Sequence, residues 1–129
     1  RDNARNLGFD HIQFHCGSWS TPLKGKFHLV LSNPPYIDGN DEHLVKGDLR
    51  FEPRGALTPG QDGLSAIREI SHLARAMLVD GGWLMLEHGW DQGPASRQIL
   101  HDAGFTAIET HQDLQDHDRV TVGENRRVC

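Results

Sequence analysis

Residues 27–36 read Phe-His-Leu-Val-Leu-Ser-Asn-Pro-Pro-Tyr, and no other stretch of the chain says as much about its structure. The apolar run from Phe27 to Leu31 is typical of a buried β-strand. Two prolines end that strand, because proline has no backbone N–H to donate to a neighbouring strand. Ligands bind at the carboxyl ends of strands in an open α/β sheet. We therefore expect a binding site at residues 33–36.

The four residues after the strand suit the binding of a planar NH2 group, whose nitrogen attacks weakly because it shares its lone pair with a π system. The Asn33 side-chain oxygen and the Pro34 carbonyl can accept its two N–H groups, which orients the nitrogen and stabilises the charge that develops as it attacks. Pro35 keeps that carbonyl from turning away, and the Tyr36 ring can cover the flat group and exclude water. A strong electrophile such as a sulfonium methyl then needs no separate base. A plain turn is the structural alternative, since Asn-Pro commonly opens turns.

The sequence on either side alternates between strand and helix patterns, as in an α/β fold. Upstream we expect a strand at residues 11–16. Downstream, apolar residues recur on one side of a helix that begins at Asp62 or Gly63 and runs to about Val79, where Gly81 and Gly82 would end it. The remaining predicted elements are a strand at Trp83–Glu87, a helix from Pro94 to Ala103, and a closing hairpin of Phe105–Thr110 and Arg119–Gly123.

Residues 37–61 lack hydrophobic periodicity and follow the predicted site directly. Loops longer than roughly 12–15 residues are usually binding loops, lids or disordered segments. We expect this loop to cover a substrate; a solvated surface excursion is the alternative.

Composition favours a single domain, with 36% hydrophobic and 24% charged residues among 129. No stretch approaches the roughly 20 apolar residues of a membrane span. The cysteines, Cys16 and Cys129, lack metal or redox spacing, so we expect Cys16 in the core, no disulfide and a cytoplasmic location. His88 has no second ligand at helical spacing, so no metal site is expected, and Glu87 before it is expected to shape the pocket rim by hydrogen bonding. The net charge of −5 argues against direct contact with nucleic acid.

Asn33-Pro34-Pro35-Tyr36 resembles the Asn-Pro-Pro-Tyr signature of S-adenosylmethionine-dependent amino-methyltransferases. Within that superfamily the chain is similar to the peptide chain release factor glutamine N5-methyltransferases over nearly its whole length. The further matching motifs are Ile37, Gly47-Asp48, Arg50-Phe51-Glu52-Pro53, Ala56-Leu57, Asp62-Gly63, Gly81-Gly82, Leu86-Glu87-His88-Gly89, Gln92, Arg119-Val120 and Gly123.

The resemblance implies a Rossmann-like methyltransferase fold, a mixed sheet with an antiparallel terminal strand, and S-adenosylmethionine as cofactor. It implies as substrate the glutamine of the Gly-Gly-Gln motif in class I peptide chain release factors. Asn33, Pro34 and Tyr36 would be catalytic, and residues 33–36 together would bind the substrate. Trp19, Ser18 and Asn33 would contact the cofactor, although Ser18 stands where the family often has Asp. A packing residue under the loop is the structural alternative for Trp19.

One departure concerns the cofactor loop, because residues 1–26 contain no glycine-rich run after a strand. Residues 1–8 read instead as the end of a helix with Gly8 as its cap. We therefore expect residues 1–129 to be the carboxyl-terminal part of the catalytic domain, without the strands that carry the cofactor loop and without the upstream helical domain that recognises the release factor. Two absent strands would separate residues 11–16 from residues 27–32. The isolated part should be poorly stable, should not bind the cofactor by itself, and should be inactive.

Two other functions remain open on the sequence alone. A DNA or RNA amino-methyltransferase would place the exocyclic NH2 of a base against Tyr36, although the acidic charge balance and residues 50–57 favour a protein substrate. A non-catalytic remnant that binds a partner through residues 37–61 would need no glycine-rich loop.

Overall fold

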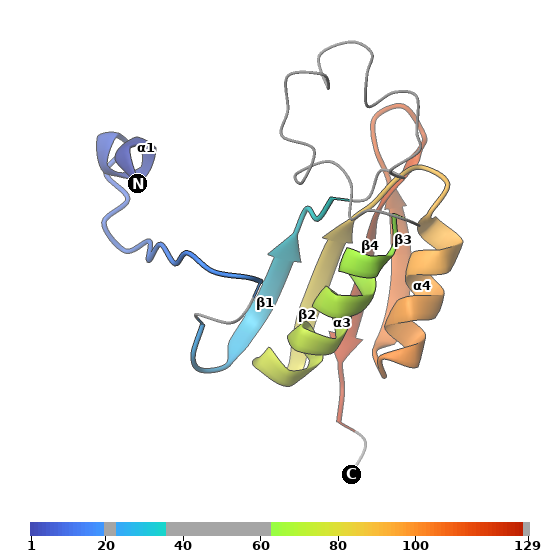
Figure 1. Cartoon of the computed structure of the whole chain (residues 1–129). Coiled ribbons are helices and arrows are strands. Elements are labelled where there is room, and N and C mark those ends of the chain that lie inside the picture. Colours follow the sequence, from blue (N-terminus) through green and yellow to red (C-terminus); the bar gives the residue numbers. More distant parts are fainter. Residues whose placement is uncertain (20–22, 36–62, 128–129) are drawn as a thin grey trace.

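The computed structural model describes residues 1–19, 23–35 and 63–127. Helices and strands alternate along most of this part of the chain, as Figure 1 shows. The elements are α1 (Asp2–Asn6), β1 (Phe27–Ser32), α3 (Ser65–Met77), β2 (Leu78–Glu87), α4 (Gly93–Asp102), β3 (Thr106–Gln112) and β4 (Asp118–Asn125).

The strands form one mixed sheet in the order β1-β2-β4-β3. β1 and β2 are parallel and are connected through α3, as a crossover between parallel strands requires. β4 runs antiparallel to both of its neighbours, β2 and β3. The predicted α/β class, the antiparallel last strand and the closing hairpin are confirmed.

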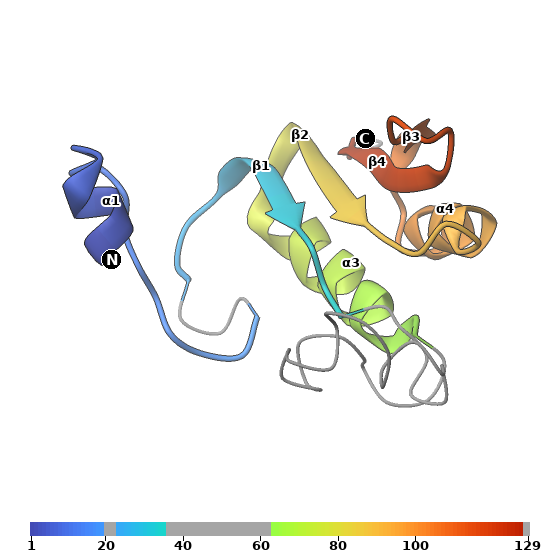
Figure 2. The same cartoon turned by 90° about the horizontal axis from the view of Figure 1, so that it is seen from above.

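The two longer helices, α3 and α4, cover one face of the sheet (Figure 2). β2 turns Leu84 and Leu86 toward these helices, as the alternation of side chains along a strand dictates. The predicted apolar side of α3 is confirmed, since Ile67, Ile70 and Ala74 are buried there. The buried core cluster consists of Ile67, Ile70, Ala74, Leu78, Leu84, Leu86, Leu100 and Phe105.

The opposite face of the sheet carries apolar side chains that remain exposed. Leu29 pairs with Trp83 and Leu31 with Met85 across β1 and β2. Leu31 is 67% exposed and Leu29 48% exposed. β1 also lies at the edge of the sheet, so within the described residues its outer side has no neighbouring strand.

The predicted strand at residues 11–16 is wrong, because these residues belong to no strand. A strand requires a hydrogen-bonded partner, and this segment pairs with none of the described strands. It leads from the sheet to α1, which stands apart from the sheet in both views (Figures 1 and 2). Cys16 is exposed there, so its predicted place in the core is also wrong. The helix before Gly8 is confirmed as α1, and Gly8 has a φ of 74°.

The end of α3 and the start of β2 also differ from the prediction. The helix ends at Met77, and Gly81 and Gly82 lie inside β2 instead of ending the helix. The carbonyls of Leu78 and Val79 accept hydrogen bonds from the Asn125 side chain, 3.0 Å from each. A side chain from the last strand therefore satisfies these groups, which is a contact that local sequence patterns do not encode. No helix in the described ranges has the length and apolarity to cross a bilayer.

Ser96 provides a stability prediction. Its hydroxyl is fully buried on α4 and has no hydrogen-bond partner among the described residues. We expect Ser96→Ala to raise the free energy of unfolding by about 1 kcal/mol, because it removes an unsatisfied buried group and favours the helix. Urea unfolding measures the change. Ser71→Ala is the matched control, since the equally buried Ser71 hydroxyl donates to the Ile67 carbonyl at 2.7 Å; equal effects of both substitutions would contradict the prediction.

Candidate functional site at the carboxyl ends of β1 and β2

The parallel strands β1 and β2 end at the same edge of the sheet, where Ser32 pairs with Leu86. Asn33 follows β1, and Glu87 is the last residue of β2. A groove of about 310 Å³ opens between these strand ends on the face that α3 and α4 leave uncovered. It is lined by Leu31, Ser32, Asn33, Met85, Glu87 and Val120.

The predicted site residues differ in burial in a way that suits binding. Asn33 is exposed and lines the groove, whereas Pro34 is fully buried and Pro35 is half-buried. A buried proline with its fixed φ anchors the backbone while the preceding amide side chain stays open to a ligand. Tyr36 and the loop at 37–61 lie outside the described residues.

Trp19 lies near the same strand end but in a different cavity. It borders a cleft of about 160 Å³ between β1 and α3 that is lined in part by Leu23, Leu31 and Ser32. Leu31 and Ser32 line both this cleft and the Asn33 groove, so the two cavities share one wall. The Trp19 side chain is 39% exposed and Ser18 before it is exposed. Trp19 therefore lies near the end of β1, in the cleft beside α3, and does not line the Asn33 groove.

The sequence alone does not reveal the role of His88. Its side chain is fully buried, with Nε2 2.8 Å from the Thr121 hydroxyl and Nδ1 2.8 Å from the Gly89 carbonyl oxygen. Burial is the largest influence on its pKa and lowers it from the usual value of 6.5. Glu87, next to it in the sequence, lines the groove on the other side of the sheet, in agreement with its predicted place at the pocket rim.

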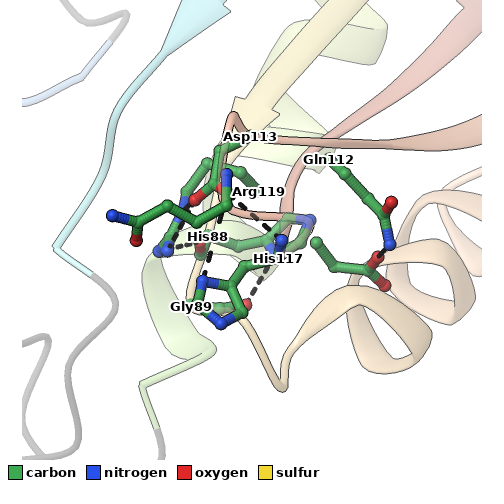
Figure 3. Close-up of polar contacts among 8 residues, drawn as sticks. His88, Gly89, Gln112, Asp113, His117 and Arg119 are labelled. Carbon is green, nitrogen blue, oxygen red and sulfur yellow. Dashed lines mark hydrogen bonds and ion pairs between the residues drawn. The ribbon is translucent and has the colours of Figure 1, made fainter.

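An ordered turn between β3 and β4 holds the backbone of His88, as Figure 3 shows. The Asp113 carboxylate accepts hydrogen bonds from the backbone N–H groups of Gln115 and His117 and from the Arg119 guanidinium. The two backbone donors, more than Arg119, lower the pKa of Asp113. The backbone carbonyl of Arg119 accepts a hydrogen bond from the backbone N–H of His88 at 2.9 Å. The Nη1 of Arg119 donates to the His88 carbonyl at 3.4 Å. The hydrogen bonds of Asp113 and Arg119 therefore fix this turn against the end of β2.

No family model matches the chain, whereas single relatives do. A protein of Vibrio cholerae named release factor glutamine methyltransferase is 53% identical over 126 residues, which are 96% of this chain and 44% of that protein. Relatives of the same name from Xylella fastidiosa and Yersinia pestis are 55% and 47% identical over 94% and 96% of the chain. The chain spans 44–45% of the length of these relatives.

A solved methyltransferase structure from Pyrococcus furiosus has the same fold over 81% of this chain and 44% of its own, with a TM-score of 0.57 and 13% identity. This likeness confirms the methyltransferase-type fold. The sequence identity to the bacterial relatives extends over more than nine-tenths of the chain. The chain is therefore similar to bacterial proteins named release factor glutamine methyltransferase over almost its whole length.

Proposed function

We propose that this chain is part of an enzyme that transfers a methyl group from S-adenosylmethionine to the side-chain amide nitrogen of the glutamine in the Gly-Gly-Gln motif of class I release factors. The observation that carries the proposal is the exposed amide of Asn33 in a groove at the carboxyl ends of two parallel strands, held by the buried ring of Pro34. The names of the relatives supply the substrate class. Release factors act in translation, so the reaction belongs to the cytoplasm.

The residues of the groove fit the reaction through hydrogen-bond acceptance. The Asn33 side-chain oxygen and the Pro34 carbonyl would each accept one N–H of the substrate amide and fix its plane. Positive charge shifts onto these hydrogens as the nitrogen forms its new bond, so acceptors placed there stabilise the transition state more than the ground state. The extra proton then leaves to solvent. Pro35 restrains the carbonyl, and Tyr36 would cover the amide, so that orientation supplies much of the acceleration.

The neighbouring cleft would take the adenine end of the cofactor. The partly exposed indole of Trp19 stands beside an apolar cleft that shares a wall with the Asn33 groove, which suits a flat heterocycle such as adenine. Ser18 can hydrogen-bond the polar rim of such a ring, and Asn33 would meet the opposite end of the cofactor. When bound, S-adenosylmethionine supplies a methyl group on a positively charged sulfur.

We further propose that the complete catalytic domain contains strands beyond those described. Three observations support this: the outer side of β1 pairs with no described strand, residues 1–26 contain no glycine-rich loop, and the relatives are more than twice as long. A separate helical domain that recognises the release factor belongs to the same proposal.

Incubation of the full-length protein with S-adenosylmethionine and a class I release factor tests the function. Mass spectrometry is expected to find one methyl group on the glutamine of the Gly-Gly-Gln motif and none when that glutamine is replaced by glutamate. Methylation of DNA or RNA bases instead, or no transfer at all, would contradict the proposal. Calorimetric titration of S-adenosylmethionine into residues 1–129 is expected to show no binding, whereas the full-length protein binds; tight binding by residues 1–129 would contradict the domain proposal.

A further inference from the structure

His88 stands where the groove meets the interior of the protein. Glu87 before it lines the Asn33 groove and, among the described lining residues, is the only charged one. The His88 side chain points to the other side of the sheet, where it contacts the Thr121 hydroxyl of β4. Thr121 pairs with Leu86 of the core, which places the His88 ring on the helix-covered side. The adjacent residues Glu87 and His88 therefore connect the rim of the groove to the core.

The hydrogen bonds of His88 continue through β4 and β3 to α4. Thr121 Oγ1 lies 2.8 Å from Thr110 Oγ1 on β3, and Thr110 Oγ1 lies 2.8 Å from Nη1 of Arg97 on α4. Arg97 can only donate, because its guanidinium carries no acceptor. The Gly89 carbonyl at the other end, 2.8 Å from His88 Nδ1, can only accept. The direction of each bond between these ends follows from the two fixed ends.

Each proton in this chain of bonds has one possible position when the ring of His88 is neutral. Nδ1 must carry the proton, because it faces the Gly89 carbonyl oxygen. Nε2 then accepts from Thr121, whose single hydroxyl proton is thereby used. Thr121 must accept from Thr110, and Thr110 accepts from Arg97. Every donor in this chain of bonds has one acceptor, and no proton is missing or surplus.

The Gly89 carbonyl that His88 contacts belongs to the turn between β2 and α4. It also accepts the Gln92 N–H at 2.9 Å, and the Gly89 N–H donates to Gln92 Oε1 at 2.8 Å. A Cβ at position 89 would lie 3.1 Å from Gln92 Oε1, closer than most such contacts. The turn is thus closed by Gln92 and tied to the core by His88.

We propose that His88, in its neutral Nδ1-protonated tautomer, is a positioning residue that fixes the end of β2 and so holds Glu87 at the rim of the substrate groove. This inference rests on the proposed function. His88 acts through Glu87, which precedes it in the chain and whose carboxylate would contact the release factor beside the target glutamine. Burial and the positive charges of Arg119 and Arg97 lower the pKa of His88, while the Gly89 carbonyl and Asp118 act in the opposite direction with smaller total effect. The ring is therefore neutral near pH 7.

The tautomer is measured by long-range ¹H–¹⁵N correlation NMR of the full-length protein. We expect a protonated Nδ1 and an unprotonated Nε2 for His88 at neutral pH, and no second protonation until the pH falls below the usual histidine range. An Nε2-protonated ring, or a doubly protonated ring at pH 7, would overturn the assignment. This measurement does not depend on methyl transfer, so it is independent of the proposed function.

Two near-isosteric variants separate positioning from plain stability. His88→Asn retains an N–H donor near the Gly89 carbonyl and loses the contact with Thr121, whereas His88→Gln retains an acceptor for Thr121 and loses the donor to Gly89. We expect both to lower the melting temperature. The KM for the release factor is expected to rise about tenfold in His88→Gln and to change little in His88→Asn, with the affinity for S-adenosylmethionine unchanged in both.

A double-mutant cycle with Glu87→Gln shows whether His88 acts through Glu87. We expect Glu87→Gln to raise the KM for the release factor and the His88→Gln/Glu87→Gln double variant to be no worse than the more impaired single variant. Additive effects, or equal KM values in His88→Asn and His88→Gln, would overturn the positioning role. Failure of the unaltered protein to methylate any release factor would overturn the proposed function instead, so the two failures are distinguishable.

Discussion

Replacement of Asn33 by alanine is expected to lower the rate of methyl transfer by about 10²–10³-fold, because it removes one of two acceptors aimed at the hydrogens where charge develops. The affinity for S-adenosylmethionine should change only modestly. Single-turnover kinetics with a release factor measure the rate, and calorimetric titration measures the affinity. Since the Asn33 side chain is exposed, the melting temperature should stay close to that of the unaltered protein.

The control for Asn33→Ala is Gln98→Ala, which removes another exposed side-chain amide, on α4 and away from the groove. Its rate of methyl transfer should equal that of the unaltered protein. Asn33→Asp retains an oxygen at the acceptor position and should lose less activity than Asn33→Ala. An unchanged rate in Asn33→Ala would show that Asn33 does not bind the reacting amide.

Asn125 is expected to be the most sensitive polar position for stability. It is fully buried in β4, its Nδ2 donates to the Leu78 and Val79 carbonyls, and its Oδ1 accepts from Arg75 Nη1. Asn125→Leu keeps the branched arrangement of side-chain heavy atoms but leaves the Leu78 and Val79 carbonyls and a guanidinium N–H without their partner. We expect the free energy of unfolding to fall by about 3 kcal/mol.

Urea unfolding of the full-length protein measures the effect of Asn125→Leu. The control is Gln112→Ala, an exposed amide near the end of β3 whose 3.4 Å contact with Asp118 should contribute little. Arg75→Lys should lose part of the stability that Asn125→Leu loses, because it keeps a donor but loses the guanidinium geometry. If Asn125→Leu were as stable as the unaltered protein, the contact between α3, β2 and β4 would not matter for the fold.

The predicted elements that proved right are those whose side chains follow a local period. The strand at Phe27–Ser32 and the one-sided pattern of α3 are each visible within a single element. The predicted burial of that strand is wrong, because none of the residues of β1 is buried in the described part of the chain. The position of Asn33 at a strand end followed from the prolines after it, which act locally as well. Such signals depend on neighbours in the sequence and need no knowledge of distant contacts.

The features that the sequence did not reveal depend on partners far away in the chain. His88 contacts Thr121, and Asn125 contacts Leu78, across separations of 33 and 47 residues. The wrong strand at residues 11–16 has the same cause, because an extended segment becomes a strand only beside another strand. A histidine directly after a buried strand was the one available signal for His88, and it does not specify which polar group lies opposite.

The uncovered sheet face that carries Leu29, Leu31 and Trp83 has a thermodynamic consequence. Apolar surface that is already in water in the folded chain adds nothing to the heat-capacity change of unfolding. Residues 1–129 by themselves should therefore unfold with a smaller heat-capacity change per residue than a sheet covered on both faces. Their free energy of unfolding should vary with temperature along a shallow curve, with a broad transition in place of a sharp one.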